Sequence, residues 1–205
     1  MGGGRRVQRE ILRECLAVLQ AHGGVDLITK YPCLSIGNPH IFQHQGFSYT
    51  HRWFKHIYLL SLLNKVLGPR LDFFRGTGRG QQLRGFLEFG KKEYPESRHI
   101  LVDLPEQLIL AYYFLRSCFP EAKIAGIDEV SNVEVISRDF VNRFDFVLVP
   151  LTLYQKIGPC ASDLFTNFAS FGEMRRYWFD YYLKSEPFST AKYFFTANHL
   201  QSYPT

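Results

Sequence analysis

Cysteine is scarce in this chain of 205 residues, which has only Cys15, Cys33, Cys118 and Cys160. No two of them form a Cys-x-x-Cys pair, and no histidine stands at the spacing of a zinc ligand. The offsets between His40, His44, His51 and His56 also match no known ligand pattern. The sequence therefore predicts no metal site, and isolated thiols of this kind are typical of a reduced, cytoplasmic protein.

The chain also lacks a long apolar stretch. No segment approaches the roughly 20 consecutive apolar residues that a membrane-spanning helix needs, so we expect no membrane partner. The opening MGGGRRVQRE has no apolar core of a secretory signal, and its sixth position lacks the Ser or Thr of a myristoylation motif. These absences favour a cytoplasmic location.

Long runs of like charge are missing as well. The net charge is only +5, because 24 Lys and Arg residues are scattered among 19 Asp and Glu residues. A nucleic-acid-binding arm would concentrate its basic residues, so nucleic acid is not the expected partner. An RNA methyltransferase remains an alternative on charge alone, and a steep salt dependence of RNA binding would be its signature.

The residues that are present predict one globular domain with an N-terminal extension. The chain is 46% hydrophobic and 16% aromatic, which is enough for a substantial core. Apolar residues at helical spacing predict helices over residues 7–21 and 51–67, the second ended by Gly68 and Pro69. Residues 31–50 read as a loop with short extended pieces. We therefore expect a helical extension over residues 1–68.

From residue 69 to residue 205, short apolar runs alternate with helical segments. Helices are expected near 81–93, 106–118 and 172–184. The expected strands are RLDFF (70–74), HILVD (99–103), AKIAGI (122–127), FDFVLV (144–149), SDLFTNF (162–168) and AKYFFTA (191–197). This alternation predicts an α/β domain, Rossmann-like, with a mostly parallel sheet and helices on both faces.

A nucleotide site is suggested by two features of this domain. Gly76, Gly78 and Gly80 follow the first expected strand, where glycines at a strand-to-helix turn let the backbone approach a ligand closely. About 25 residues later the second strand ends on Asp103, the distance at which an acidic residue reaches ribose hydroxyls. The alternative is that Asp103 is only a turn residue or helix cap.

The glycine spacing helps to choose the ligand. The dinucleotide pattern G-x-G-x-x-G fails because Gln81 and Leu83 stand where its last glycine is needed, which makes a nicotinamide-dependent oxidoreductase a distant alternative. The G-x-G-x-G that is present resembles the first motif of S-adenosylmethionine-dependent methyltransferases. Phe74, however, occupies the position where that motif usually has an acidic residue, and Arg75, Arg79 and Arg84 make the segment basic.

Four further stretches match a known family in order and spacing over about residues 34–205. They are SIGNPHIF (35–42), HILVDLPEQLILAYYFL (99–115), SDLFTNFASFGEM (162–174) and KYFFTANHLQSYP (192–204). Together they resemble a family of sugar O-methyltransferases. The resemblance implies a class I methyltransferase sheet, S-adenosyl-L-methionine as cofactor and a sugar or glycan hydroxyl as acceptor.

The candidate site residues follow from these motifs and from the loops behind the strands. Glu173 and His199 are candidates for taking the hydroxyl proton, although a first-turn helix charge and an exposed loop histidine are the alternatives. The candidate cofactor-binding residues are Gly76, Gly78, Gly80, Asp103 and Leu104. The candidate substrate-binding residues are Asn38, Asn167 and Ser170, with Asn38 also readable as part of a structural turn.

Two functions therefore fit the sequence: an O-methyltransferase, or a non-catalytic relative that acts as a binding module, which the substituted glycine segment favours. The resemblance implies seven strands, but only eight residues follow the strand at 191–197. We thus expect the last two strands to be missing, which would leave that strand at an open edge. An apolar edge strand is a pairing hazard, so a homodimer through this edge is an associated expectation.

Overall fold

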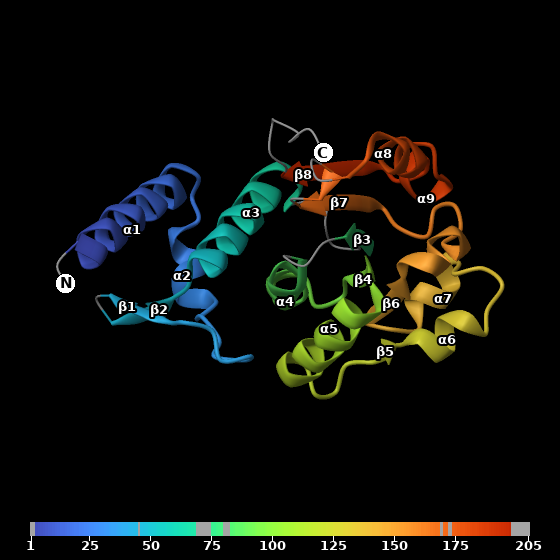
Figure 1. Ribbon diagram of the computed structural model, residues 1–205, viewed down its shortest axis with the longest axis horizontal. Helices are drawn as coiled ribbons and strands as arrows, with labels where there is room; N and C mark the ends of the chain where they lie inside the picture. Colours follow the sequence, from blue (N-terminus) through green and yellow to red (C-terminus); the bar gives the residue numbers. More distant parts are fainter. Residues whose placement is uncertain are drawn as a thin grey trace. The chain divides into compact units, whose positions relative to one another are not determined.

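The computed structural model describes residues 3–44, 46–68, 75–79, 83–168, 170–171 and 174–197. The chain forms two compact units, Met1–Arg70 and Leu71–Thr205. The sequence placed this division between residues 68 and 69. Figure 1 labels the helices and strands of both units.

The first unit is mostly helical. Its elements are α1 (Gly3–Ala21), α2 (Val25–Lys30), the antiparallel pair β1 (Phe42–His44) and β2 (Phe47–Tyr49), and α3 (His51–Leu67). Helix α3 has the predicted bounds because its signals are local: the Thr50 side chain accepts a hydrogen bond from the Trp53 N–H at 3.0 Å. The expected extended pieces between residues 31 and 50 are confirmed as β1 and β2, whereas the short helix α2 was not predicted.

The second unit contains a parallel sheet. Among the described residues it has six strands in the order β5-β6-β4-β3-β7-β8, and every neighbouring pair is parallel. The strands are β3 (Arg75–Arg79), β4 (Arg98–Asp103), β5 (Ile124–Ala125), β6 (Phe146–Pro150), β7 (Leu164–Phe168) and β8 (Tyr193–Ala197). If the two-residue β5 is set aside, the chain order across the sheet is 3-2-1-4-5, which is compatible with a Rossmann-like, doubly wound fold.

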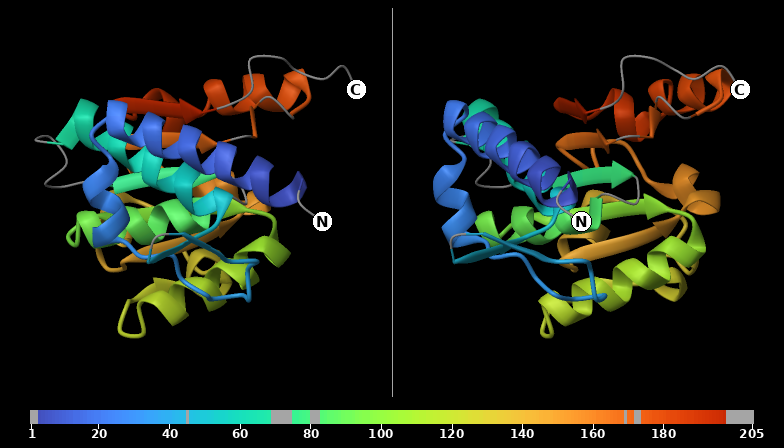
Figure 2. Two further views of the ribbon diagram at one scale, coloured as in Figure 1. Left: turned by 90° about the vertical axis from the view of Figure 1, so that its left-hand side faces the viewer. Right: turned by 60° about the vertical axis from the view of Figure 1, so that its left-hand side comes forward.

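Helices cover both faces of this sheet, as expected (Figures 1 and 2). One face carries α4 (Leu83–Glu93) and α5 (Pro105–Cys118), and the other face carries the remaining described helices of this unit. These are α6 (Ile127–Ser131), α7 (Arg138–Asn142), the 3-10 helix η2 (Leu151–Lys156), α8 (Arg176–Leu183) and α9 (Glu186–Ser189).

The alternation of side chains along the strands explains the two layers of core. In β4, Ile100 and Val102 are buried in a cluster with Val130 of α6, Val141 of α7 and other residues of that face. The intervening Leu101 points to the opposite face, where α5 buries Leu108, Ala111 and Leu115. Because both faces are covered, the central strands β4 and β6 carry near-continuous apolar runs.

Two expectations for the strands need correction or limitation, and a third is confirmed. The strand expected over 122–127 is only Ile124–Ala125, because Ile127 already begins α6. The strand expected over 70–74 lies outside the described residues, and the first strand of the sheet is Arg75–Arg79 instead. Strand β8 pairs only with β7 among the described residues and so forms an edge of the sheet, as predicted.

Candidate functional site

The candidate site lies at the carboxyl ends of β3, β4 and β7. In doubly wound sheets a ligand binds outside the strand ends where the strand order reverses, which here lies between β3 and β7. Buried polar residues gather near these ends: Asp103 in β4, and Thr166 and Asn167 in β7, with exposed fractions of 9%, 4% and 0%. Buried polar side chains among apolar strands indicate a site or a structural hydrogen-bond network.

Asp103 is the last residue of β4, as predicted. Its carboxylate Oδ1 accepts a hydrogen bond from the Leu104 N–H at 2.9 Å. The cap of α5 is Leu104 and not Asp103, so the alternative of a helix N-cap does not hold for Asp103. Leu104 itself is 45% exposed, which leaves an apolar surface directly beside the carboxylate.

Asn167 and Ser170 are brought together behind β7. The Asn167 Nδ2 donates to the Ser170 Oγ at 2.6 Å, and the Asn167 Oδ1 accepts from the Phe171 N–H at 3.1 Å. Both ends of the buried amide therefore organise the turn that follows the strand. This role is structural, and it fixes the position of Ser170 whether or not a substrate binds there.

Asp103 and Asn167 lie on different strands and different faces of the sheet. Strand β3 separates β4 from β7, so their ends are about 10 Å apart at the usual strand spacing. Asp103 alternates with Val102 and so belongs to the face of α4 and α5, whereas Asn167 belongs with Phe165 to the opposite face. The two side chains can contact opposite ends of one extended ligand, but they cannot bind the same atom.

The glycine turn expected after the first strand is wrong for Gly76 and Gly78. Both lie inside β3, where Gly76 is opposite His99 and Gly78 is opposite Leu101 of β4. Glycine is uncommon in strands, which is why the sequence favoured a turn here. The register pairs both glycines with residues of β4 that alternate with Ile100 and Val102.

The other candidate residues are distributed as follows. Asn38 belongs to the first unit, where it and Gly37 have left-handed backbone angles with φ of 50° and 79°, in agreement with the structural turn. Gly80, Glu173 and His199 lie outside the described residues. Their roles as cofactor-binding and proton-accepting groups stay predictions.

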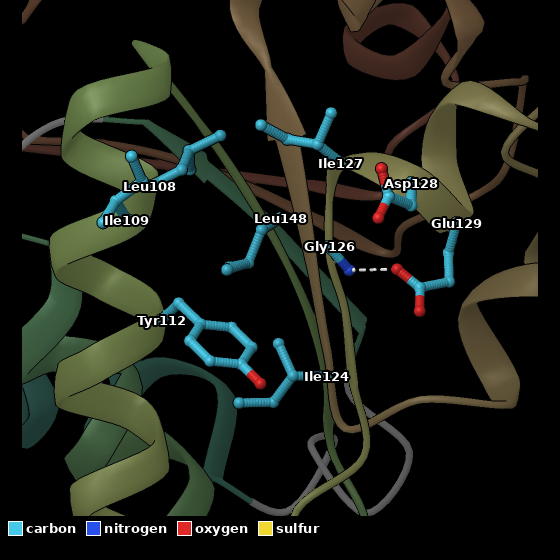
Figure 3. Close-up of a pocket in the computed structure, with 9 residues that line it drawn as sticks. All are labelled: Leu108, Ile109, Tyr112, Ile124, Gly126, Ile127, Asp128, Glu129 and Leu148. Carbon is cyan, nitrogen blue, oxygen red and sulfur yellow. Dashed lines mark hydrogen bonds between the residues drawn. The ribbon is translucent and has the colours of Figure 1, made fainter.

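A pocket that the sequence did not predict lies beside α5. It has a volume of about 340 Å³ and is bordered by α5, the short strand β5, the start of α6 and Leu148 of β6. Figure 3 shows Tyr112 reaching from α5 toward Ile124, with Leu108 and Ile109 above it. The Gly126 N–H donates to the Glu129 Oε2 at 2.8 Å on the far wall. The sequence feature that could have indicated this pocket is the number of apolar residues on α5, which is larger than one buried helix face requires.

A charge network around Lys91 and Asp145 lies away from these strand ends. The Lys91 Nζ donates to the Asp145 Oδ1, which precedes β6, and to the carbonyl of Ser97, which precedes β4, at 2.8 Å each. Burial, followed by the charges of Lys91 and Arg98, lowers the pKa of His99 to about 3, so this imidazole is neutral. Because these groups sit at the amino ends of the strands, we assign them a structural role.

No protein-family model matches this chain, and no curated protein matches its sequence. In the part of the chain that the structure describes, no three His, Cys, Asp or Glu residues are grouped as metal ligands. None of the described helices is both long and apolar enough to span a membrane.

Proposed function

We propose that the second unit binds S-adenosyl-L-methionine and transfers its methyl group to a hydroxyl of a sugar or glycan. The observation that supports this most strongly is the position of Asp103. It is a buried carboxylate at the carboxyl end of the strand next to the glycine-bearing strand, in a sheet whose order reverses on the other side of β3. Ribose hydroxyls are natural donors to such a carboxylate.

The chain's own residues then have distinct tasks. Asp103 would hold the ribose, and the exposed Leu104 beside it would offer an apolar surface to the adenine ring. The ordered turn of Asn167 and Ser170 would border the acceptor, while Glu173 or His199 would take the proton of the acceptor hydroxyl. The cofactor supplies an electrophilic methyl group, and the protein supplies alignment and a proton acceptor.

A non-catalytic binding module is the second candidate, and the position of the glycines favours it. Gly76 and Gly78 are held in β3 by pairing on both sides, with β4 and with β7. They are therefore unavailable for the turn that would bring the backbone to the cofactor. Among the described residues, Asp103 fits the ribose of the cofactor, whereas Gly76 and Gly78 do not form the turn that would approach the rest of it.

Calorimetric titration with S-adenosyl-L-methionine and with S-adenosyl-L-homocysteine separates the two candidates. For Asp103→Ala we expect affinity to fall by about 1.5–3 kcal/mol, or about 10- to 150-fold, which is the worth of hydrogen bonds to a charged group. Asp128→Ala, which removes an exposed carboxylate on α6, is the matched control and should bind like the wild type. No binding by the folded wild type would leave the binding module as the function.

The acceptor side is tested by methyl transfer to a panel of glycans. Glu173→Gln and His199→Asn should lower kcat while the affinity for the cofactor stays close to that of the wild type. Equal turnover in both variants would remove these two residues from the mechanism.

A further inference from the structure

The outer face of α5 is unusually apolar for a helix at the surface. Ile109, Leu110, Tyr112 and Tyr113 have exposed fractions of 66%, 51%, 40% and 64%. The helix already buries Leu108, Ala111 and Leu115 against its own sheet, so these four residues form a second apolar face. Contiguous exposed apolar residues of this kind mark interaction sites more often than chance.

The exposed residues of α5 are arranged symmetrically about Ala111. Ile109 and Tyr113 lie two residues before and after it, and Glu106 and Arg116 lie five residues before and after it. At 3.6 residues per turn, all four fall on the side of the helix opposite Ala111. The apolar centre of this face is therefore flanked by a negative charge at one end and a positive charge at the other.

The two charges are placed to pair across an interface. Glu106 is in the first turn of the helix and Arg116 in the last, so they cannot reach each other along α5. The Arg116 Nη1 donates to the carbonyls of Pro120 and Ala122 at 2.7 and 3.0 Å, and the guanidinium lies 5.7 Å from the centre of the Tyr112 ring. These contacts hold the head group in place, while its remaining N–H groups can serve a carboxylate.

We propose that two copies of this chain associate through α5, with the two helices antiparallel around a twofold axis at Ala111. Residues at equal distances before and after the axis then meet at the same level along the pair. Ile109 packs on Tyr113 of the partner subunit, and Glu106 lies near Arg116 of the partner subunit. Each contact occurs twice, as in every isologous interface.

A second copy is the occupant that explains the whole pattern. An unrelated partner would need only an apolar patch, whereas opposite charges at equal distances from the centre are complementary to the same surface turned by 180°. The sequence had placed a homodimer at the edge strand β8. The apolar surface of α5 is larger, because β8 exposes one large hydrophobic residue, Phe194, whereas α5 exposes four.

Sedimentation analysis of the full chain across a range of concentrations tests this interface. We expect a reversible dimer in the wild type, and we expect Ile109→Glu to weaken it by about 100-fold or more, since two charges would be buried against apolar residues. The control is Val66→Glu, which places the same charge on an apolar residue of α3 that is 70% exposed. This variant should dimerise like the wild type.

A charge exchange makes the test specific for the antiparallel arrangement. Glu106→Arg places like charges together twice, and Arg116→Glu does the same with the opposite sign, so each should weaken the dimer. The double variant should restore it, because the pairs are then exchanged and not lost. Circular dichroism confirms that each variant is folded. A wild type that stays monomeric, or a dimer that is indifferent to all α5 variants, would overturn the proposal.

Discussion

Removal of the Asp145 carboxylate should destabilise the second unit more than its partly exposed position suggests. The side chain of Lys91 is only 10% exposed, and its Nζ has three oxygen acceptors: Asp145 Oδ1 and the carbonyls of Pro95 and Ser97. Asp145 also accepts from the backbone N–H of Lys123 at 2.9 Å. The variant Asp145→Ala leaves a buried ammonium without its counter-charge.

The size of this effect follows from burial. Breaking a fully buried ion pair costs about 3–5 kcal/mol, because one charge stays behind in a poor solvent. The Asp145 side chain is 24% exposed, so water can partly replace it, and two carbonyls remain for Lys91. We therefore expect the free energy of unfolding to fall by about 2–3 kcal/mol, which corresponds to a Tm lowered by about 4–12 °C for a chain of this size.

Thermal unfolding followed by circular dichroism measures the change, and Asp180→Ala provides the control. Asp180 pairs with Arg176 within one exposed helix at 3.1 Å, an arrangement worth about 0.3–0.5 kcal/mol. Its removal should therefore leave the Tm almost unchanged. Equal Tm values for Asp145→Ala and Asp180→Ala would refute the argument that burial makes the first pair important.

The pH dependence gives a second check on Asp145. Burial alone would raise the pKa of this carboxyl, but the hydrogen bonds from Lys91 and from the Lys123 N–H hold it below its ordinary value of 3.8. A depressed pKa in the folded state stabilises the fold above 3.8, and this contribution is lost as the pH falls further. Burial lowers the pKa of Lys91, although the hydrogen bond and the charge of Asp145 oppose that change. The difference in free energy of unfolding between the wild type and Asp145→Ala should therefore become smaller below pH 3.8.

Two further variants test other parts of the fold. His99 is neutral in the folded state, but in the unfolded state it takes up a proton below its ordinary pKa of 6.5, so the free energy of unfolding of the wild type should fall as the pH is lowered from 6.5 to about 3. In His99→Phe this fall should be shallower. If unfolding by urea at a series of pH values gives the same pH dependence for both proteins, His99 is not its source. In the first unit, a Cβ at Gly24 would come within 2.9 Å of Leu19 and Ser61, so Gly24→Ala should lower the free energy of unfolding by about 1–3 kcal/mol. The control is Gly68→Ala, whose Cβ would have no atom within 4 Å and which should be nearly neutral. Equal Tm values for the two variants would show that the packing at Gly24 relaxes freely.

The candidate site was only partly predictable from the sequence. Asp103 was placed correctly at a strand end because a run of buried apolar residues stops there and Pro105 begins a helix. The glycines were misplaced because their position in β3 depends on hydrogen bonds to two strands, β4 and β7, that are far away in the sequence. Similarly, the sequence offered Asn167 for substrate binding, and only the structure shows its amide engaged with Ser170 and Phe171.

What the sequence by itself determined is the set of elements whose causes are local. The periodicity of residues 51–67, with Gly68 and Pro69 after them, is sufficient to define α3, and the alternation of apolar runs with helical segments is sufficient for a parallel α/β sheet. Only the tertiary structure decided that β6 pairs directly with β4 and leaves the short β5 at the edge, and that α5 has a second apolar face turned outward. The physical reason is that strand neighbours and exposed faces depend on contacts between distant segments, and a local pattern records that a residue is apolar without recording which surface covers it.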